Sequence, residues 1–356
     1  MSQVALQNVT KRFGGVTALN DISFDVRDGE LFVLLGPTGA GKTTTLRAIA
    51  GLEKPDAGAV VFDGQDVTAL APADRDVAFV FQQYSLYPNM SVYDNLAFPL
   101  RSPMRKTSES DIKKRVEDTA AVLRITHLLT RKTAKLSGGE MQRVSIGRAI
   151  VRSPRIYLMD EPLSNLDAKL REALRVELSH LQKTQGSTTL FVTHDQIEAL
   201  TMAERIAVLN HGRIVQIGSP TDIYDTPATT YVAQLVGSPK INLLSAANAD
   251  NKLSLEQSSI NLPITDVCPN GDCLPEKFIM GVRPEDVRLA GSGLFGGEVI
   301  LVEPLGVETL LHIKIGGQTV VSTVGGMSQV RRGETVRFNL QPERLHFFDP
   351  TSGQRI

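Results

Sequence analysis

Short apolar runs alternate with amphipathic stretches over the first two-thirds of the chain. Leu31 to Leu35 is a continuous apolar run, and Thr44 to Ala50 has helix-like spacing after a glycine-rich loop. Apolar runs return at Ile156 to Met159 and at Leu190 to Val192, each ending on polar residues. Buried parallel strands have this pattern and deliver functional groups at their carboxyl ends. We therefore predict an α/β core with a parallel sheet.

Residues from about 85 to 152 depart from this pattern, because most of their charge falls in helix-like spacing. In the stretch 107–125, TSESDIKKRVEDTAAVLRI, Ser108 or Ser110 can cap a helix ahead of acidic residues in its first turn. A further apolar run at Ile156 follows the segment, so the core sheet continues beyond it. We predict an inserted helical subdomain at about 85–152.

The pattern changes again after Leu235, where short β-type runs are separated by pairs of glycines. The segments GGEVILVEPLG, TLLHIKIGGQTVVSTVGG and RRGETVRFNL have this character. We predict a first domain at residues 1–235 and a separate all-β domain, a small barrel or sandwich, at residues 236–356.

Composition limits the classes of partner. The 356 residues include 38 Lys and Arg against 39 Asp and Glu, and this balance argues against the basic surface that nucleic-acid binding needs. No apolar run reaches the roughly 18 residues of a membrane span, and the start of the chain lacks the apolar core of a secretion signal. We expect a cytosolic protein. Its two cysteines, Cys268 and Cys273, supply only half of a four-ligand zinc site and are expected to be reduced thiols.

The loop after the first apolar run carries a phosphate-binding pattern. Residues 36–43 read GPTGAGKT, which is Gly-x4-Gly-Lys-Thr between a strand and a helix. In that setting the backbone N–H groups of the loop face phosphate oxygens. Lys42 would neutralise β- and γ-phosphate charge, and Thr43 would place its hydroxyl on Mg²⁺. The sequence therefore predicts that the chain binds and hydrolyses ATP with Mg²⁺.

Two adjacent carboxylates, Asp160 and Glu161, end the apolar run at Ile156 to Met159. The first can hold the water shell of magnesium, and the second can orient a hydrolytic water. Apolar strands that end at an acidic turn are also common in purely structural settings. The functional interpretation therefore depends on the other motifs.

A second anion-binding pattern precedes that strand, where residues 136–143 read LSGGEMQR. Ser137 and two glycines at a helix start expose N–H donors to an anion. With this segment the chain resembles the ATP-binding-cassette (ABC) family over roughly residues 2 to 235. In that family the signature of one copy caps the γ-phosphate held by the phosphate loop of another. The resemblance implies that two copies close head to tail around two ATP molecules.

The remaining family elements occur in the same order along the chain. They are Gln82 in VFQQY, Ser164-Asn165-Leu166-Asp167 in the loop that faces the partner cassette, and His194 in FVTHD. Phe13 stands where the family stacks an aromatic ring on adenine. Asn165 departs from the pattern, since alanine is common there. We expect no effect of this departure on the chemistry, because the residue lies in a contact loop.

The resemblance implies a set of site residues. Glu161, His194 and Lys42 would be catalytic, and Thr43, Gln82 and Asp160 would hold Mg²⁺. The residues expected to contact ATP are Phe13, Gly36, Pro37, Thr38, Gly39, Ala40, Gly41, Lys42, Thr43, Thr44 and Gln82, together with Ser137, Gly138, Gly139, Gln142 and Asp167 of a second copy.

Docking on separate membrane subunits is expected, because an ABC cassette that moves solute without a membrane span needs permeases. The stretch QQYSLYPNMSVYDNL could form the docking groove, so two permease subunits are expected near Gln82 to Ser91, although its aromatics fit a core position equally well.

In the tail, GSPKINLL, GVRPEDV and VEPLGVETLLHI resemble the linker and the oligonucleotide-binding-like (OB-like) regulatory domain of maltose-type bacterial importers. The implied fold is a P-loop NTPase ABC cassette with an inserted helical subdomain and an OB-like C-terminal domain. The implied location is the cytoplasmic face of the bacterial inner membrane, as a peripheral subunit.

Several functions share this plan. The linker GSPKIN is most like that of carbohydrate importers, including those for oligosaccharides and glycerol phosphodiesters, with a periplasmic or extracellular solute-binding protein as an indirect partner. Polyamine, sulfate and ferric-ion importers are alternatives. A soluble non-transport ABC ATPase would carry a coiled-coil insertion or tandem cassettes, and a non-hydrolysing scaffold would lack Glu161 or His194. For the tail, homodimer contact is favoured over ligand or regulator binding.

Overall fold

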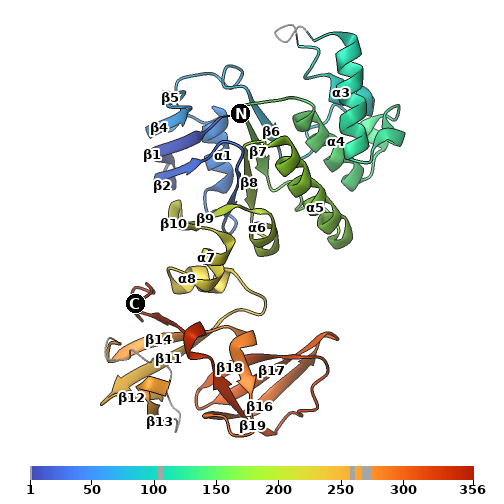
Figure 1. Cartoon of the computed structure of the whole chain (residues 1–356). Coiled ribbons are helices and arrows are strands. Elements are labelled where there is room, and N and C mark those ends of the chain that lie inside the picture. The colour runs from blue at the N-terminus through green and yellow to red at the C-terminus, as the bar shows by residue number, and fades with distance from the viewer. Residues whose placement is uncertain (1, 103–106, 257–260, 267–273) are drawn as a thin grey trace. The chain divides into compact units, whose positions relative to one another are not determined.

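The computed structural model describes residues 2–102, 107–256, 261–266 and 274–356, which leaves Cys268 and Cys273 outside the described residues. The chain divides into two compact units, Met1–Pro220 and Thr221–Ile356 (Figure 1). The sequence predicted the division at 235/236, later than the structure places it. The difference arises because α8 (Thr230–Leu235) and most of α7 (Pro220–Asp225) belong to the second unit.

A buried arginine explains this boundary. Arg283 is 2% exposed, and its guanidinium donates hydrogen bonds to the carbonyl oxygens of Tyr224 at 2.8 Å and Ala233 at 3.2 Å. Ala233 also packs with Ile241 and Phe348 of the second unit. The short helices are therefore attached to the β-rich part of the chain by contacts that no local sequence pattern indicates.

A six-stranded sheet forms the core of the first unit in the part that the structure describes. Its order is β10-β9-β3-β8-β7-β6, with parallel pairing from β9 to β6 and β10 antiparallel at one edge. The strands are β3 (Leu31–Leu35), β6 (Val77–Val80), β7 (Ile156–Asp160), β8 (Thr189–Thr193), β9 (Arg205–Asn210) and β10 (Arg213–Gly218). Every residue of β3, β7 and β8 is buried, which explains their continuous apolar runs.

A smaller antiparallel sheet pairs strands in the order β2-β1-β4-β5. These strands are β1 (Val4–Phe13), β2 (Val16–Val26), β4 (Ala57–Phe62) and β5 (Gln65–Asp66). Both sheets contribute side chains to one apolar cluster, which also contains residues of the helix α1 (Lys42–Ala50). The helix that follows the glycine-rich loop is therefore anchored in the main core.

The insertion between β6 and β7 is helical, with α3 and α4 standing to one side of the large sheet (Figure 1). Its α-helices are α2 (Val92–Ala97), α3 (Glu109–Val122) and α4 (Gly138–Ile150). Ser108 caps α3, since its Oγ accepts a hydrogen bond from the backbone N–H of Asp111 at 3.2 Å. Beyond the insertion, α5 (Ala168–Gln185) follows β7 and α6 (Gln196–Met202) follows β8.

The second unit is built mainly of antiparallel β-structure, as the glycine-separated runs predicted. Its described strands pair in two five-stranded sheets, β13-β12-β11-β14-β20 and β15-β19-β16-β17-β18, around a shared apolar core. The strands are β11 (Asn242–Ala249), β12 (Lys252–Leu255), β13 (Asn261–Pro263), β14 (Lys277–Val282), β15 (Val287–Leu289), β16 (Phe295–Pro304), β17 (Glu308–Ile315), β18 (Gln318–Gly325), β19 (Thr335–Leu340) and β20 (His346–Phe348).

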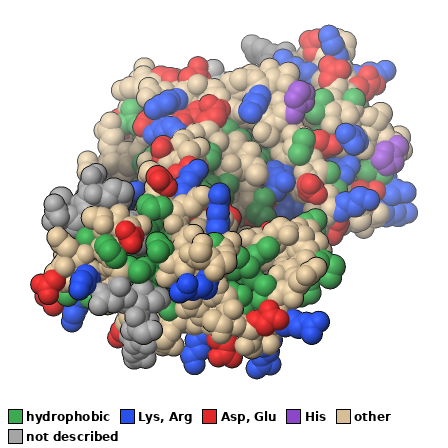
Figure 2. Space-filling view, turned by 60° about the horizontal axis from the view of Figure 1, so that its bottom comes forward, with side chains coloured by type: hydrophobic (Ala, Val, Ile, Leu, Met, Phe, Trp, Pro, Cys, Tyr) green, Lys and Arg blue, Asp and Glu red, His purple; other side chains and the backbone are tan. Residues whose placement is uncertain are grey.

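Charged side chains of both signs are interspersed on the face drawn in Figure 2. They lie among apolar and other side chains there, in line with the near-equal numbers of basic and acidic residues in the sequence. Within the described ranges, no helix combines the length and hydropathy of a membrane span.

Candidate active site

The glycine-rich loop connects β3 to α1 at the carboxyl edge of the large sheet. Gly41 has a φ of +108°, and a Cβ there would lie 2.5 Å from the carbonyl oxygen of Ala18. A Cβ on Gly36 would lie 2.3 Å from the carbonyl oxygen of Leu209. Both positions therefore require glycine. Helix α1 has neither a side-chain cap nor an acidic residue in its first turn, as suits a helix start that receives an anion.

The three residues predicted to be catalytic form a continuous chain of contacts. Lys42, which is 5% exposed, forms an ion pair from Nζ to Oε1 of Glu161 at 3.2 Å. The second carboxylate oxygen of Glu161, Oε2, lies 3.1 Å from Nδ1 of His194. These residues follow β3, β7 and β8, which are neighbours in the sheet. Because parallel strands end at the same edge, the topology brings them together.

Two of the three residues predicted to hold magnesium, Thr43 and Asp160, also meet at this edge. Thr43 donates a hydrogen bond from Oγ1 to Oδ1 of Asp160 at 3.0 Å. Burial raises the pKa of Asp160, and the Glu161 charge acts in the same direction, whereas the Thr43 hydroxyl, Arg47 and Lys42 oppose the shift. A hydroxyl beside a carboxylate suits Mg²⁺, which binds few protein oxygens and completes its shell with phosphate and water.

An open cavity of about 380 Å³ lies over the loop. The predicted site residues that line it are Thr38, Gly39, Gly41, Lys42, Thr43, Thr44, Gln82 and Glu161. Four further lining residues were not predicted: Val16, Thr17 and Ala18 at the start of β2, and His211 in the turn between β9 and β10. None of these four lies in a recognisable motif, so only the fold reveals their place.

Phe13, predicted to stack on adenine, is not among the lining residues of this cavity. It ends β1 with 47% of its surface exposed, and Lys11 Nζ lies 5.2 Å from the centroid of its ring. Two glycines separate it from Val16, which does line the cavity. Phe13 is therefore near a lining residue in sequence, but its ring does not border the cavity.

The signature segment begins α4. Ser137 and Glu140 form a reciprocal capping box, in which the Ser137 N–H donates to Glu140 Oε2 at 2.8 Å and Ser137 Oγ accepts from the Glu140 N–H at 3.4 Å. A Cβ on Gly139 would lie 2.2 Å from Cδ2 of Leu170 on α5. Gly139 therefore also permits the close approach of two helices within one chain.

Gln142 is a correction to the predicted site. Its side chain is 1% exposed, and its Nε2 has no hydrogen-bond partner among the described residues. Contact with a nucleotide on a second copy requires a surface side chain, and the structure buries this one. Position in the motif suggested a ligand, whereas the period of α4 places the residue on the buried face of the helix.

The loop after β7 contacts the predicted site in a way that the sequence did not indicate. Asn165 donates a hydrogen bond from Nδ2 to the carbonyl oxygen of Gln82 at 3.2 Å. The expectation that Asn165 has no effect on the chemistry stays a prediction, since the contact is with the backbone of Gln82. Asp167, predicted to reach the nucleotide of a second copy, caps α5 within its own chain by accepting from the Leu170 N–H at 3.0 Å.

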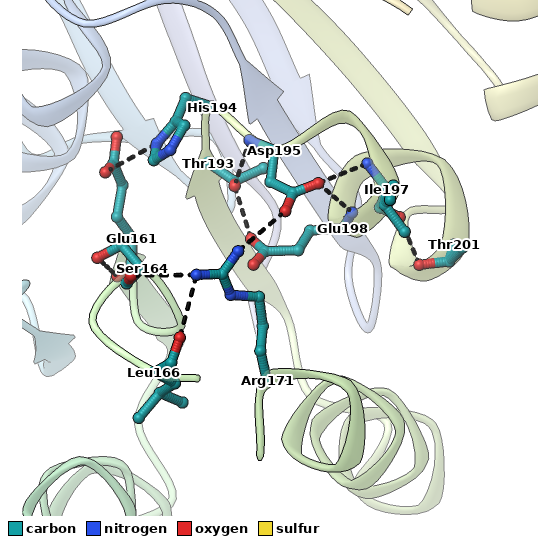
Figure 3. A network of polar contacts seen from close by, with 10 residues as sticks. All are labelled: Glu161, Ser164, Leu166, Arg171, Thr193, His194, Asp195, Ile197, Glu198 and Thr201. Atoms are coloured by element: carbon teal, nitrogen blue, oxygen red, sulfur yellow. Dashed lines mark hydrogen bonds and ion pairs between the residues drawn. The ribbon is translucent and has the colours of Figure 1, made fainter. Parts of the chain in front are cut away.

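A polar network centred on Arg171 connects the turns that carry Glu161 and His194 (Figure 3). Arg171 on α5 donates from Nη2 to the carbonyl oxygens of Ser164 at 3.2 Å and Leu166 at 3.1 Å. Its Nη1 lies 3.5 Å from Oδ2 of Asp195. The sequence had not indicated Arg171 or Asp195, because an arginine on an amphipathic helix carries no motif of its own.

Buried groups continue this network beyond His194. The Asp195 N–H donates to Oγ1 of Thr193 at 2.9 Å, and this hydroxyl donates to Oε2 of Glu198 at 2.6 Å (Figure 3). Burial raises the pKa of Glu198, against the effect of the Thr193 hydrogen bond. The turn after β8 is therefore held by side chains on both sides of His194.

Comparison with known proteins identifies the family. The sequence model of the ABC transporter family matches residues 19–164, and that of the TOBE domain matches residues 280–348. The trehalose/maltose import ATP-binding protein MalK of Thermococcus litoralis is 46% identical over 373 aligned positions that cover all of both chains. The chain belongs to the ABC transporter family. The sn-glycerol-3-phosphate import ATP-binding protein UgpC of Cupriavidus necator is 43% identical, again over the full length of both chains.

Solved ABC cassettes have the fold of the first part of the chain. A dimeric post-hydrolysis state of the cassette MJ0796, bound to ADP and Pi, is 32% identical with a TM-score of 0.56, and the match covers 61% of this chain and 98% of that one. A nucleotide-free ABC transporter cassette is 28% identical with a TM-score of 0.58, covering 67% of this chain and all of the other. The predicted fold class and the enzyme class of an ABC transporter ATPase are confirmed.

Proposed function

We propose that the chain is the ATP-hydrolysing subunit of an importer for a carbohydrate or a related solute. The observation that carries this proposal is the contact chain Lys42–Glu161–His194 beside the glycine-rich loop. The cargo class is supported by full-length relatives named for trehalose/maltose and for sn-glycerol-3-phosphate import. Because these names indicate a carbohydrate or a polyol phosphate as cargo, polyamine, sulfate and ferric-ion import and a non-transport role are not favoured.

Hydrolysis would proceed by in-line attack of water on the γ-phosphate. The glycine-rich loop would hold the phosphates through its free backbone N–H groups and Lys42, and Glu161 would polarise the water. In the structure both carboxylate oxygens of Glu161 are engaged, one by Lys42 and one by His194. A γ-phosphate that attracts Lys42 would release Oε1 for the water, while His194 still holds Oε2. Nucleotide binding would thereby prepare the base.

Magnesium would be held by Thr43 and Asp160, which are already in contact, with Gln82 at the border of the same cavity. When bound, the ion supplies positive charge to the β- and γ-phosphate oxygens. Thr43 and Asp160 orient it from the loop and from the end of β7. Burial raises the pKa of Asp160 although Thr43, Arg47 and Lys42 partly compensate its charge, and a bound cation would compensate it further.

A second copy of the chain would complete each ATP site. Ser137 and Asp167 are exposed, as a contribution to another copy requires, and Gly138 and Gly139 adjoin Ser137 at the start of α4. The dimeric cassette of MJ0796 with ADP and Pi supports this arrangement. Gln142 does not belong to the proposed shared site, because its side chain is buried.

Two permease subunits would dock near Gln82 to Ser91. Docking would hold the chain at the cytoplasmic face of the bacterial inner membrane. A solute-binding protein would be an indirect partner. Aromatic side chains with exposed surface support this location. Tyr87 is 37% exposed and pairs with Phe98, which is 46% exposed, at a ring-centroid distance of 4.6 Å. Apolar surface of this kind suits the insertion of a helix from another protein.

The substitution Glu161→Gln tests the catalytic assignment. We expect hydrolysis of radiolabelled ATP to fall by about 100-fold or more, because a positioned base contributes roughly 10²–10⁴. ATP binding should persist, since the loop and Lys42 are unchanged. Glu172→Gln, at an exposed position of α5, is the matched control and should turn over normally. Normal turnover by Glu161→Gln would exclude this residue as the base.

The cargo requires a separate measurement. We expect the solute-binding protein encoded beside this chain to bind an oligosaccharide or a glycerol phosphodiester. Selective binding of a polyamine, sulfate or ferric ion would contradict the cargo assignment and leave the ATPase assignment intact.

A further inference from the structure

One arginine joins the two turns that present Glu161 and His194. The guanidinium of Arg171 reaches the turn after β7 through the carbonyl oxygens of Ser164 and Leu166. It reaches the turn after β8 through the carboxylate of Asp195. The side chains that emerge from these turns, Glu161 and His194, approach to 3.1 Å (Figure 3).

The backbone of Glu161 needs such support. Its φ is +45°, in the left-handed region that residues other than glycine rarely adopt. Such a conformation persists only where surrounding contacts determine it. Ser164 supplies two of them, because its N–H and its Oγ donate to the Glu161 carbonyl oxygen at 3.2 and 3.0 Å. Ser164 is in turn held by Arg171 at its own carbonyl oxygen.

The His194 side of the link is equally well anchored. Asp195, the next residue, caps α6 by accepting from the Ile197 N–H at 2.7 Å with Oδ1. Its other carboxylate oxygen, Oδ2, faces Arg171. The carboxylate therefore connects the arginine to a helix start, and the backbone that carries His194 lies between these contacts and Thr193.

We propose that Arg171 is a positioning residue that holds Glu161 and His194 at the spacing needed for hydrolysis. The inference rests on the proposed function of these two residues. Arg171 acts through Ser164 and Asp195, and none of its contacts is with the three residues proposed to be catalytic. A planar guanidinium can direct separate N–H groups at carbonyl oxygens and a carboxylate together, whereas a lysine ammonium is a point charge. Charge alone should therefore not replace it.

Arg171→Lys tests the proposal in the full-length chain, with Arg175→Lys as the matched control. Arg175 lies one turn further along α5, and its side chain makes no ion pair or hydrogen bond with the described part of the chain. We expect Arg171→Lys to lower kcat about tenfold with KM for ATP changed less than about twofold, because the phosphate loop is untouched. Its unfolding midpoint should stay within about 2 °C of that of the control.

Nuclear magnetic resonance of [¹⁵N]histidine-labelled protein supplies a readout that does not depend on turnover. The His194 ring signals, assigned with His194→Gln, should shift in Arg171→Lys and stay unchanged in Arg175→Lys. Unchanged kcat and unchanged His194 signals would overturn the proposal. A joint fall of kcat and unfolding midpoint, without movement of the His194 signals, would also overturn it, since Arg171 would then be purely structural. If the wild-type chain hydrolyses no ATP but the signals move, the proposed function fails and the geometric role of Arg171 stands.

Discussion

Asp160 carries a charge that the chain without nucleotide disfavours. It is 5% exposed, and burial raises its pKa above the ordinary value of 3.8. The ionised form at neutral pH therefore costs folding free energy, and this cost disappears as the pH falls through the raised pKa. The charge that lowers stability here, beside the Thr43 hydroxyl, is the one that the proposed magnesium ion would compensate.

Asp160→Asn separates these two effects. The amide can still accept the Thr43 hydrogen bond but carries no charge, so the unfolding midpoint of the nucleotide-free chain at pH 7 should rise by about 2–4 °C. The gain should shrink as the pH falls through the raised pKa of Asp160, because the wild-type carboxyl then becomes protonated. Magnesium-dependent ATPase should be lost. A lower midpoint than wild type at pH 7, measured by circular dichroism, would contradict this account.

At the scale of elements, strand β20 buries an imidazole that lowers the stability of the second unit in acid. His346 is 5% exposed, and its Nδ1 has no hydrogen-bond partner among the residues that the structure describes. Burial lowers the pKa of His346 to about 4, and the charges of Arg355, Arg283 and Arg344 act in the same direction. The folded state therefore favours the neutral ring.

The pH dependence has a definite sign. The pKa of His346 is lowered from 6.5 to about 4, so the ring is neutral in both the folded and the unfolded chain above pH 6.5 and does not reduce the folding stability there. As the pH falls from 6.5 toward 4, the unfolded chain takes up a proton that the folded chain does not, and the folding stability falls. Urea unfolding should show stability falling with a slope of at most about 1.4 kcal/mol per pH unit from this group. His346→Gln should remove that part of the slope, and His180→Gln, on the exposed surface of α5, should not. Equal slopes in wild type and His346→Gln would refute the assignment.

In helix α4 the sequence motif and the helical period give different predictions for the same residue. The motif predicted that residues 137–139 and Gln142 all meet a nucleotide of a second copy. The structure leaves Ser137 at the exposed start of the helix and buries Gln142 one turn later. A motif marks the residues of a segment together, whereas each residue of an α-helix is rotated by about 100° from the one before, so that neighbours in sequence face different sides.

At the scale of the whole molecule, the proposed shared ATP site predicts recovery of activity between inactive copies. Lys42→Ala damages the glycine-rich loop in one variant, and Ser137→Ala damages the signature segment in the other. In a mixed dimer one site carries both changes and the other carries neither. An equal mixture should therefore recover about a quarter of wild-type activity if dimers form at random and the sites act independently.

The mixture is compared with each variant alone and with a double variant that carries both changes. Recovery in the mixture but not in these three controls supports a site built from two copies. A mixture that only averages the two separate activities would show that each chain completes its own site.

Much of the site follows from the sequence because local motifs carry it. Residues 36–43 need no tertiary information, since glycines at fixed spacing between a strand and a helix determine both the backbone path and the direction of its N–H groups. Asp160, Glu161 and His194 could be predicted because each ends an apolar run, and parallel strands bring such ends to one edge. The glycine-separated runs likewise predicted the β-rich second unit.

Only the tertiary structure decided which side chains support these groups. Arg171 reaches Asp195 over 24 residues of sequence, and Asn165 reaches Gln82 over 83. The unit boundary at 220/221 likewise depends on Arg283, which binds α7 and α8 from distant sequence. The sequence by itself therefore determined the phosphate loop and the residues at the strand ends, because their chemistry is encoded locally. The positions of Arg171, Asn165 and Gln142 depend on how helices pack on the sheet, which short-range patterns do not encode.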